Sequence, residues 1–468
     1  MRMRTSIIMF GLLFLGAVPA SAQVNAASCS SADVQAAINS ATAGQTVNVP
    51  SGNCTWTVPV TLCQSLTLSG AGSGSTNITI DVGTGFGNDG IYVNGCSGKQ
   101  IRITGFTFHN ESSDSFGMLM FTGGTGLSLR VDHNTFDQAG DYGRFISFRV
   151  PVISPGVLID HNTVTDEGSL VENVQSAETN PGDAAWTQTM AFGAINAVYF
   201  ENNTMTYPSY ATHAVDIDCD DGGKYVFRYN TESGNTVGNH GYDSVPNGCA
   251  EEDVYNNTLS ANNVAPFAIQ YRGGTGVVYN NLVTGTATQV QFGVTDYRSA
   301  SGGFTIHGIC DGTNSVDQNT LPTATNFGWA CHEQIGRGVN QASYPLYEWN
   351  NCTASLGCTP GSANQVAISV YQNYGGTNYT AAHIEANRDY YDAVASYNGT
   401  AGVGQGTLAQ RPSTCTPSVA YWATDTNTLY QCSLADVWKV YFTPYQYPHP
   451  LEGASSVAPA TGLIASSQ

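Results

Sequence analysis

Short alternating runs of apolar and polar residues, each built around an asparagine, recur along the middle of the chain. They read VDHNTF, IDHNTV, FENNTM, FRYNTE, VYNNTL and VYNNLV, with a weaker YEWNNCT at 347–353. Their shared asparagines are Asn134, Asn162, Asn203, Asn230, Asn257 and Asn281, spaced by about 27 residues except at one larger gap. Alternation of this kind predicts strands, and a fixed period of this length predicts a solenoid, a propeller or an array.

Apolar residues keep fixed positions around these asparagines. Those three residues before are Val131, Ile159, Phe200, Phe227, Val254 and Val278, and those two residues after are Phe136, Val164, Met205, Leu259 and Val283, with Glu232 as the exception. Scattered glycosylation sequons would not repeat these flanking positions. The pattern therefore predicts one repeated unit of short strands.

Helical periodicity is nearly confined to residues 31–41 (SADVQAAINSA). Ser31 can cap this segment, and Val34, Ala37 and Ile38 share one face. A single amphipathic helix ahead of the first strand can cover the apolar layer at the end of a solenoid.

Composition and the N-terminus indicate an exported, β-rich protein. Of 468 residues, 15 are Lys or Arg and 35 are Asp or Glu, so the formal net charge of -20 argues against a nucleic-acid partner. Arg2 and Arg4, the apolar stretch 7–18 and Ala20-Ser21-Ala22 predict a secretory signal peptide over residues 1–22. No later segment holds 18 uninterrupted apolar residues, so we expect no membrane span and a secreted, cell-surface or periplasmic location.

The cysteines suit an oxidising compartment. Their number, 12, is even, and none forms a Cys-x-x-Cys pair or a zinc-finger spacing with histidines. The spacings suggest local bridges: Cys29–Cys54, Cys63–Cys96, Cys219–Cys249, Cys310–Cys331, Cys352–Cys358 and Cys415–Cys432.

With the 31–41 helix, the entry GQTVNVPSGN, the strand LTLSGAG and the asparagine rungs, residues 29–355 resemble the right-handed parallel β-helix proteins of the pectate lyase-like superfamily. The resemblance implies an all-β solenoid with an N-terminal cap helix over residues 23–355. Stacked asparagines at a tight turn would then hydrogen-bond from coil to coil. Residues 356–468 lose the rung pattern and are expected to form a C-terminal cap or extension; an aromatic-rich carbohydrate-binding module is the alternative.

One dense patch of charge could carry chemistry. His213 and Asp216 recur 27 residues later as His240 and Asp243, and Gln270 follows at the same offset with Arg272 close by. The loop between them contributes Asp218, Asp220, Asp221 and Lys224. Residues one coil apart in a β-helix lie about 4.8 Å from each other, so the two His-x-x-Asp pairs are expected to stack. We therefore take His213, Asp216, His240, Asp243 and Arg272 as candidate catalytic residues, and Asp218, Asp220 and Asp221 as candidate metal ligands.

Two mechanisms fit the patch. In a lyase, Ca²⁺ held by carboxylates neutralises the uronate of an acidic polysaccharide, and Arg272, Lys224 or a neutral histidine removes the α-proton before β-elimination. In a hydrolase, one carboxylic acid protonates the glycosidic oxygen while another activates water or attacks. Motifs of both families are present in part. The VDHNTF and IDHNTV rungs look like the Asp-His rung of pectate lyases, without their paired arginines. Asp220-Asp221 and His240-Gly241 look like two polygalacturonase motifs, without the Arg-x-Lys motif.

Structural interpretations remain open beside these. The Asp-rich loop could bind a structural Ca²⁺, and His213 and His240 could form a packed ladder. The column Asp132, Asp160 and Glu201 reads as a solvated strand face, and the run 251–253 reads as an exposed turn. The functions that remain are a lyase acting on an acidic polysaccharide, a glycoside hydrolase of polygalacturonase type, and a non-catalytic adhesive β-helix that binds glycan. Neither the polysaccharide nor the oligomeric state follows from the sequence.

Overall fold

The computed structural model places most of the mature chain. The structure describes residues 23–83, 89–111, 118–122, 126–138, 144–148, 156–166, 169–172, 190, 192–208, 217–219, 222–239, 249–295, 335–338, 342–371 and 384–453. The predicted signal peptide lies outside these residues. No helix in the described part of the chain has the length and apolarity needed to span a bilayer.

Parallel strands dominate the fold, and the longest sheet, sheet A, runs almost the whole length of the molecule. Its order is β1 (Gln23–Asn25), β2 (Thr46–Val49), β5 (Leu66–Gly70), β8 (Gln100–Thr104), β11 (Ser128–Asp132), β14 (Val157–Asp160), β17 (Val198–Glu201), β20 (Lys224–Arg228), β23 (Glu251–Tyr255), β26 (Val277–Tyr279), β29 (Leu346–Trp349) and β31 (Tyr390–Tyr391). Every neighbouring pair in this sheet is parallel.

Two further faces complete the stack. Sheet B contains β3 (Gly52–Trp56), β6 (Thr76–Ile80), β9 (Thr107–Asn110), β12 (Thr135–Gln138), β15 (Thr163–Asp166), β18 (Thr204–Thr206), β21 (Thr231–Ser233), β24 (Thr258–Ser260) and β27 (Leu282–Thr284). Sheet C contains β4 (Val60–Thr61), β7 (Ile91–Asn94), β10 (Leu119–Thr122), β13 (Arg144–Phe148), β16 (Ser169–Glu172) and β19 (Ile217–Asp218). Sheet D contains β22 (Val237–Gly238), β25 (Ile269–Tyr271), β28 (Phe292–Val294) and β30 (Ser369–Val370), and β22 contacts β19 of sheet C.

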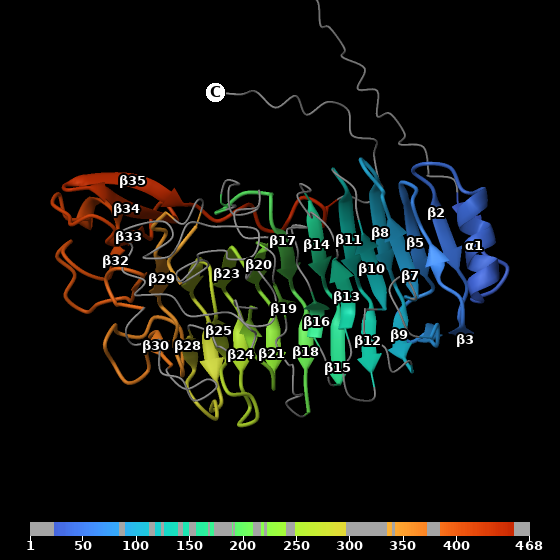
Figure 1. The fold of residues 1–468 in the computed structure, drawn as a ribbon, viewed down its shortest axis with the longest axis horizontal. Helices are drawn as coiled ribbons and strands as arrows, with labels where there is room; N and C mark the ends of the chain where they lie inside the picture. Colours follow the sequence, from blue (N-terminus) through green and yellow to red (C-terminus); the bar gives the residue numbers. More distant parts are fainter. Residues whose placement is uncertain are drawn as a thin grey trace, which may run out of the picture.

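The chain visits these faces in a fixed order. In the middle of the stack each coil contributes one strand to sheet C or D, one to sheet A and one to sheet B, and the next coil pairs in parallel with it. The strands therefore form an elongated three-sided stack (Figure 1). This nearly all-β arrangement with long parallel sheets is consistent with the predicted parallel β-helix.

The predicted asparagine column is confirmed as a continuous hydrogen-bonded ladder between sheets A and B. In each step the amide Nδ2 of one asparagine donates to Oδ1 of the next, from Asn134 through Asn281 and on to Asn351 of the weaker repeat. The residue before each asparagine adopts a positive φ: His133, His161, Asn202, Tyr229, Asn256, Asn280 and Asn350. This left-handed step turns the chain from sheet A into sheet B.

The only helix longer than one turn among the described residues is α1 (Ser31–Ser40), which lies at the N-terminal end of the stack (Figure 1). Ser30, one residue before the expected cap, accepts from Asp33 N–H. Val34, Ala37 and Ile38 are buried, and the helix contacts β1, β2 and β4. Its apolar face thus covers the first strands.

The parallel stack continues beyond residue 355, where the sequence analysis set the end of the solenoid. Strands β30 and β31 extend sheets D and A. A short 3-10 helix, η3 (Leu408–Gln410), and sheet E follow; sheet E contains β32 (Val403–Gly406), β33 (Ala420–Ala423), β34 (Thr428–Leu434) and β35 (Val437–Phe442). After β35 the chain runs back along the stack as residues 443–453, named here the C-terminal strap (Figure 1).

The disulfide pairing agrees with the prediction wherever the structure describes it. The bridges are Cys29–Cys54, Cys63–Cys96, Cys219–Cys249, Cys352–Cys358 and Cys415–Cys432. Cys310 and Cys331 lie outside the described residues. Most bridges join neighbouring parts of the chain, and Cys219–Cys249 ties the end of β19 to the start of β23 one coil later.

The expectation of an exposed turn at residues 251–253 is wrong. Glu251, Glu252 and Asp253 lie in β23 and are fully buried. Burial raises the pKa values of Glu252 and Asp253 well above their usual range, and the nearby charge of Glu251 adds to the shift at Asp253. Buried Tyr441 of sheet E lies near this run, since Glu251 and Asp253 are among the groups that raise its pKa after burial and Tyr347. The C-terminal region thus removes from solvent a strand that the local sequence marks as polar.

Candidate functional site

Most of the predicted charged patch lies outside the described residues. This applies to His213, Asp216, Asp220, Asp221, His240 and Asp243. Two members of the patch remain. Asp218 ends strand β19, of which the backbone is described, and Arg272 follows strand β25.

The backbone register of sheet C places a second acidic residue beside Asp218. Strands β16 and β19 pair in parallel, with Val171 opposite Ile217 and Glu172 opposite Asp218. Residues in register on adjacent parallel strands lie on the same face, about 4.8 Å apart. The sequence analysis did not select Glu172, because the run SLVE around it carries no asparagine marker and its coil is lengthened by an insertion before β17.

The spacing used to extend the patch to Gln270 is wrong. Gln270 pairs with Gly238, not with a residue 27 positions before it. The coils differ in length at their loops, so a constant offset fails on this face although it holds at the asparagine ladder. Gln270 is buried.

Arg272 is held against the coil that precedes it. Its backbone N–H donates to Asn239 Oδ1 at 2.7 Å, and its Nε donates to the Asn239 carbonyl at 2.6 Å. Asn239 directly precedes His240 in the sequence. Burial raises the pKa of neighbouring Glu252 well above its usual range, although the Arg272 charge opposes that shift. A protonated Glu252 does not neutralise Arg272, so this surface of sheet D retains a positive charge.

The acidic column of sheet A is buried and ion-paired, which corrects its interpretation as a solvated face. Asp132, Asp160 and Glu201 have no exposed surface. Arg102 donates to both oxygens of Asp132 at 2.7 and 2.5 Å, and Arg130 donates to both oxygens of Asp160 at 2.9 and 2.6 Å. Arg228, which the sequence analysis did not consider, pairs with Glu201.

Two of these aspartates also bind the histidines that follow them. His133 Nδ1 lies 2.7 Å from Asp132 Oδ2, and His161 Nδ1 lies 2.9 Å from Asp160 Oδ2. Burial favours a raised pKa for Asp132, but the Arg102 hydrogen bond and the charges of Arg130 and Arg102 outweigh it, so the pKa lies below its usual value. The two imidazoles stack on successive coils with their centroids 5.0 Å apart and their planes within 3°.

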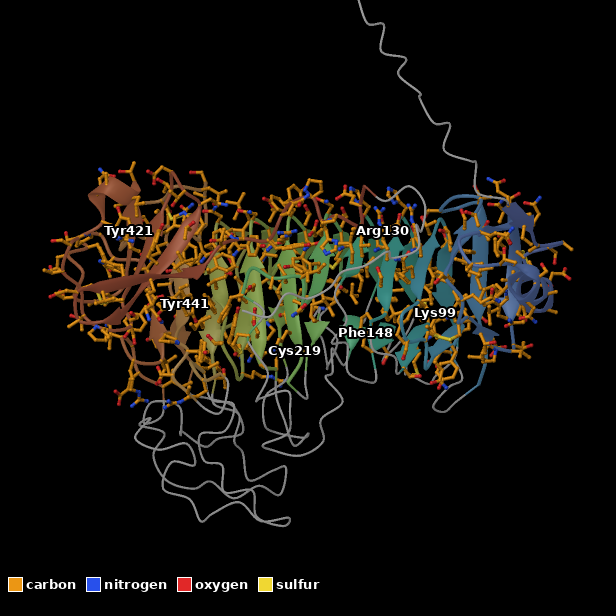
Figure 2. The ribbon with its side chains drawn as sticks, turned by 90° about the horizontal axis from the view of Figure 1, so that it is seen from above. Lys99, Arg130, Phe148, Cys219, Tyr421 and Tyr441 are labelled. Atoms are coloured by element: carbon orange, nitrogen blue, oxygen red, sulfur yellow. A yellow bond between two sulfur atoms is a disulfide. The ribbon has the colours of Figure 1, made fainter. Side chains whose placement is uncertain are left out.

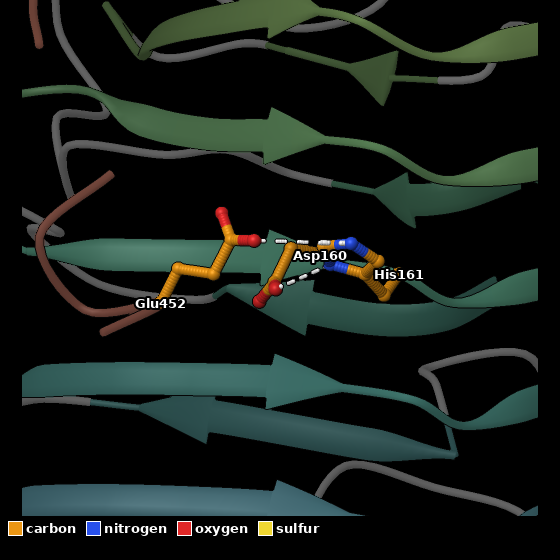
Figure 3. Close-up of side chains that lie close together, drawn as sticks. All are labelled: Asp160, His161 and Glu452. Carbon is orange, nitrogen blue, oxygen red and sulfur yellow. Dashed lines mark hydrogen bonds and ion pairs between the residues drawn. The ribbon is translucent and has the colours of Figure 1, made fainter. Parts of the chain in front are cut away.

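A carboxylate from the C-terminal strap completes this cluster. Glu452 Oε1 lies 3.8 Å from His161 Nε2, as Figure 3 shows, and Arg130 Nη1 donates to the Glu452 carbonyl at 3.0 Å. Asp160, His161 and Glu452 bring ligand-type atoms within 4.8 Å of one another. No pattern in the sequence could have joined Glu452 to His161, because nearly 300 residues separate them.

Comparison with models of known protein families, with curated protein sequences and with solved structures found no match to this chain. The function therefore has to be argued from the residues and their placement.

Proposed function

We propose that this chain is a secreted, right-handed parallel β-helix of the pectate lyase-like kind that cleaves an acidic polysaccharide by Ca²⁺-assisted β-elimination. The long three-sided parallel stack and its asparagine ladder support the fold assignment. Helix α1 and the C-terminal region serve as end caps, since each covers apolar strand surface. Several disulfides support export, because such bridges persist in oxidising compartments.

The observation that carries the proposal is the register of Glu172 with Asp218 on sheet C. Two carboxylates at neighbouring positions of parallel strands repel each other unless one takes up a proton or a cation lies between them. Carboxylate oxygens are the ligands that Ca²⁺ prefers. Ca²⁺ bound there would supply the charge that neutralises a uronate and acidifies its α-proton.

Arg272 contributes positive charge farther along the same side of the stack. It follows β25, two coils from β19, which corresponds to about 10 Å along the axis. A guanidinium does not lose its proton in proteins, so Arg272 binds a substrate carboxylate in this mechanism instead of acting as base. The proton-abstracting role stays with His240 or Lys224. An extended anionic chain would lie across sheets C and D, with its carboxylates over the acidic pair and over Arg272.

The same register also suits a retaining glycoside hydrolase, in which the two carboxyl groups stand about 5–5.5 Å apart. Hydrolysis yields new reducing ends, whereas elimination also yields unsaturated sugars that absorb ultraviolet light. A glycan-binding protein without activity yields neither product. Both products are therefore measured on the same samples.

Substitution at the acidic pair tests the placement of the site. Glu172→Gln and Asp218→Asn should each lower the rate of ultraviolet-absorbing product formation by roughly 100-fold or more, because each removes a charge that the mechanism requires. Asp137→Asn removes an exposed carboxylate from sheet B and should leave the rate within about twofold. Full activity of both sheet C variants would contradict the placement, and reducing ends without ultraviolet absorbance would replace the lyase by the hydrolase.

A further inference from the structure

The two stacked histidines have a fixed tautomer. The Asp132 and Asp160 carboxylates each accept a two-pronged hydrogen bond from an arginine, so they act as acceptors toward the imidazoles. Each Nδ1 must then carry the proton. The lone pair of each ring lies on Nε2, on the side away from the aspartate. Histidines that bind metal ions are commonly oriented by a carboxylate in this way.

Both rings are also held in place and open to solvent. His133 and His161 stand at the left-handed turn position, with φ of 53° at each. Their side chains are 56% and 35% exposed, whereas the aspartates behind them are fully buried. The buried Arg–Asp pairs anchor the inner edge of each imidazole, and the outer edge with Nε2 faces the surface.

Glu452 presents a carboxylate to the same place. Its Oε1 lies 3.8 Å from His161 Nε2, and within the described part of the structure its Oε2 is buried without a hydrogen-bond partner. The backbone of the strap is fixed here, because Arg130 Nη1 donates to the carbonyls of Leu451 and Glu452 at 3.1 and 3.0 Å. A buried carboxylate oxygen without a partner is costly, and a cation would satisfy it.

We propose that His133 Nε2, His161 Nε2 and the Glu452 carboxylate form a binding site for a transition-metal ion such as Zn²⁺ or Cu²⁺. Two imidazoles and one carboxylate are a ligand set for these ions, whereas Ca²⁺ prefers oxygen ligands alone. Two nitrogens on one tetrahedral Zn²⁺ stand roughly 3.4 Å apart, given Zn–N bonds of about 2.0–2.1 Å. The stacked rings reach that separation by tilting their exposed edges together while keeping the Nδ1–H···Asp bonds.

This site is separate from the polysaccharide site and does not rest on it. It lies at the turn from sheet A to sheet B, whereas Glu172 and Asp218 lie on sheet C. Figure 2 shows Arg130 of sheet A and Cys219, which follows β19, on different sides of the stack. Because the ion would bridge two coils and the strap, its binding should hold residues 443–453 against sheet A.

The test is Zn²⁺ binding to the full mature chain by calorimetric titration, without polysaccharide. We expect about one high-affinity ion per chain. His133→Asn and His161→Asn should each weaken binding at least tenfold. Asparagine is the matched replacement, because it occupies the same left-handed position in other coils, as at Asn202 and Asn256. Glu452→Gln should also weaken binding, and Zn²⁺ should raise the melting temperature of wild type but not of these variants.

His109→Asn is the control, since His109 is a partly exposed histidine of sheet B that lies 3.7 Å from the Asp137 carboxylate. It should leave Zn²⁺ affinity unchanged. With Cu²⁺, electron paramagnetic resonance should show two nitrogen ligands in wild type and one in either histidine variant. The proposal is overturned if wild type binds no Zn²⁺ or if the His133→Asn/His161→Asn double variant retains wild-type affinity. Equal weakening by His109→Asn would overturn it as well.

Discussion

At the scale of single residues, the asparagine ladder does what a backbone alone cannot do at the turn between sheets A and B. Asn203 shows the arrangement: its Oδ1 accepts from the backbone N–H and the Nδ2 of Asn162 at 3.0 and 3.1 Å. Its Nδ2 donates to the Ile159 carbonyl at 2.9 Å and to Asn230 Oδ1 at 3.0 Å. Each ladder residue therefore satisfies buried polar groups of neighbouring coils, where water is absent.

Removing one ladder side chain should be strongly destabilising. Asn203→Ala leaves the buried Asn162 N–H and Ile159 carbonyl without their partners, at a cost of about 1–3 kcal/mol for each group. We expect the free energy of unfolding to fall by roughly 2–5 kcal/mol in urea titrations. Thr204→Ala, at the exposed next position, should change it by less than about 0.5 kcal/mol. Equal effects of the two substitutions would contradict the role of the ladder.

The ladder could be predicted from the sequence, because its partners are copies of itself one coil away and the repeat displays them. The arginine partners of Asp132 and Asp160 could not. Arg102 and Arg130 stand at one strand position and bind a carboxylate at another position of the next coil. Such diagonal pairing leaves no repeat in the sequence, and so the acidic column looked solvated.

At the scale of elements, the C-terminal strap packs over buried charge on sheet A. Arg228 has no exposed surface and pairs with Glu201. Its Nη1 and Nη2 donate to the carbonyls of Tyr445 and Gln446, each at 2.7 Å. Tyr447 stacks on Tyr229 with centroids 3.7 Å apart. One arginine therefore joins two strands of the stack to the strap.

Breaking this connection should destabilise the protein and release the strap. Arg228→Met leaves the Glu201 carboxylate buried without its cation, which typically costs about 3–5 kcal/mol. Adding Glu201→Gln should recover part of the loss, because the unpaired charge is gone. The measurements are urea denaturation and proteolytic cleavage within residues 443–453. Lys439→Met, on exposed strand β35, is the control; wild-type stability and protease resistance in Arg228→Met would refute the account.

The strands of the stack were predictable as elements, but their partners across the molecule were not. Alternation and the asparagine period predict strands on both sides of the ladder, since these signals are local. The burial of Glu251 and Asp253 depends on sheet E, more than 150 residues later. For the same reason the sequence gave no sign that Glu452 meets His161. Register on sheets C and D also escaped prediction, because loop insertions there change the spacing from coil to coil.

At the scale of the whole molecule, buried carboxyl groups should make stability depend on pH. Burial raises the pKa of Glu348 to about 8, aided by nearby Asp392, and burial raises the pKa of Asp392 to about 6. The pKa values of Glu252 and Asp253 are raised too. These groups hold protons in the folded chain that the unfolded chain has released. The folded state is therefore favoured at low pH and loses stability as pH rises.

We expect the melting temperature to fall as pH rises from about 5 to about 8, with most of the loss between about 6 and 8. Asp392→Asn should flatten this dependence, because the amide keeps an oxygen that can accept from Ile368 N–H but cannot ionise. Asp137→Asn, at an exposed carboxylate, should leave the slope unchanged. Calorimetric scans across this pH range provide the measurement. Stability that rises with pH throughout would show that these carboxyl groups are ionised in the folded protein.

The central claim is that the coils of sheets C and D bring acidic side chains and Arg272 together to cleave an anionic polysaccharide with the aid of Ca²⁺. The most direct measurement is the ultraviolet absorbance of polygalacturonate, alginate and glycosaminoglycan solutions incubated with the mature protein. Each substrate is assayed with Ca²⁺, with a chelator, and with Ca²⁺ restored after chelation. We predict that absorbance rises on at least one of these substrates, stops on chelation and returns with Ca²⁺. No rise on any acidic polysaccharide in the presence of Ca²⁺, or a rise that persists in the chelator, would contradict the account.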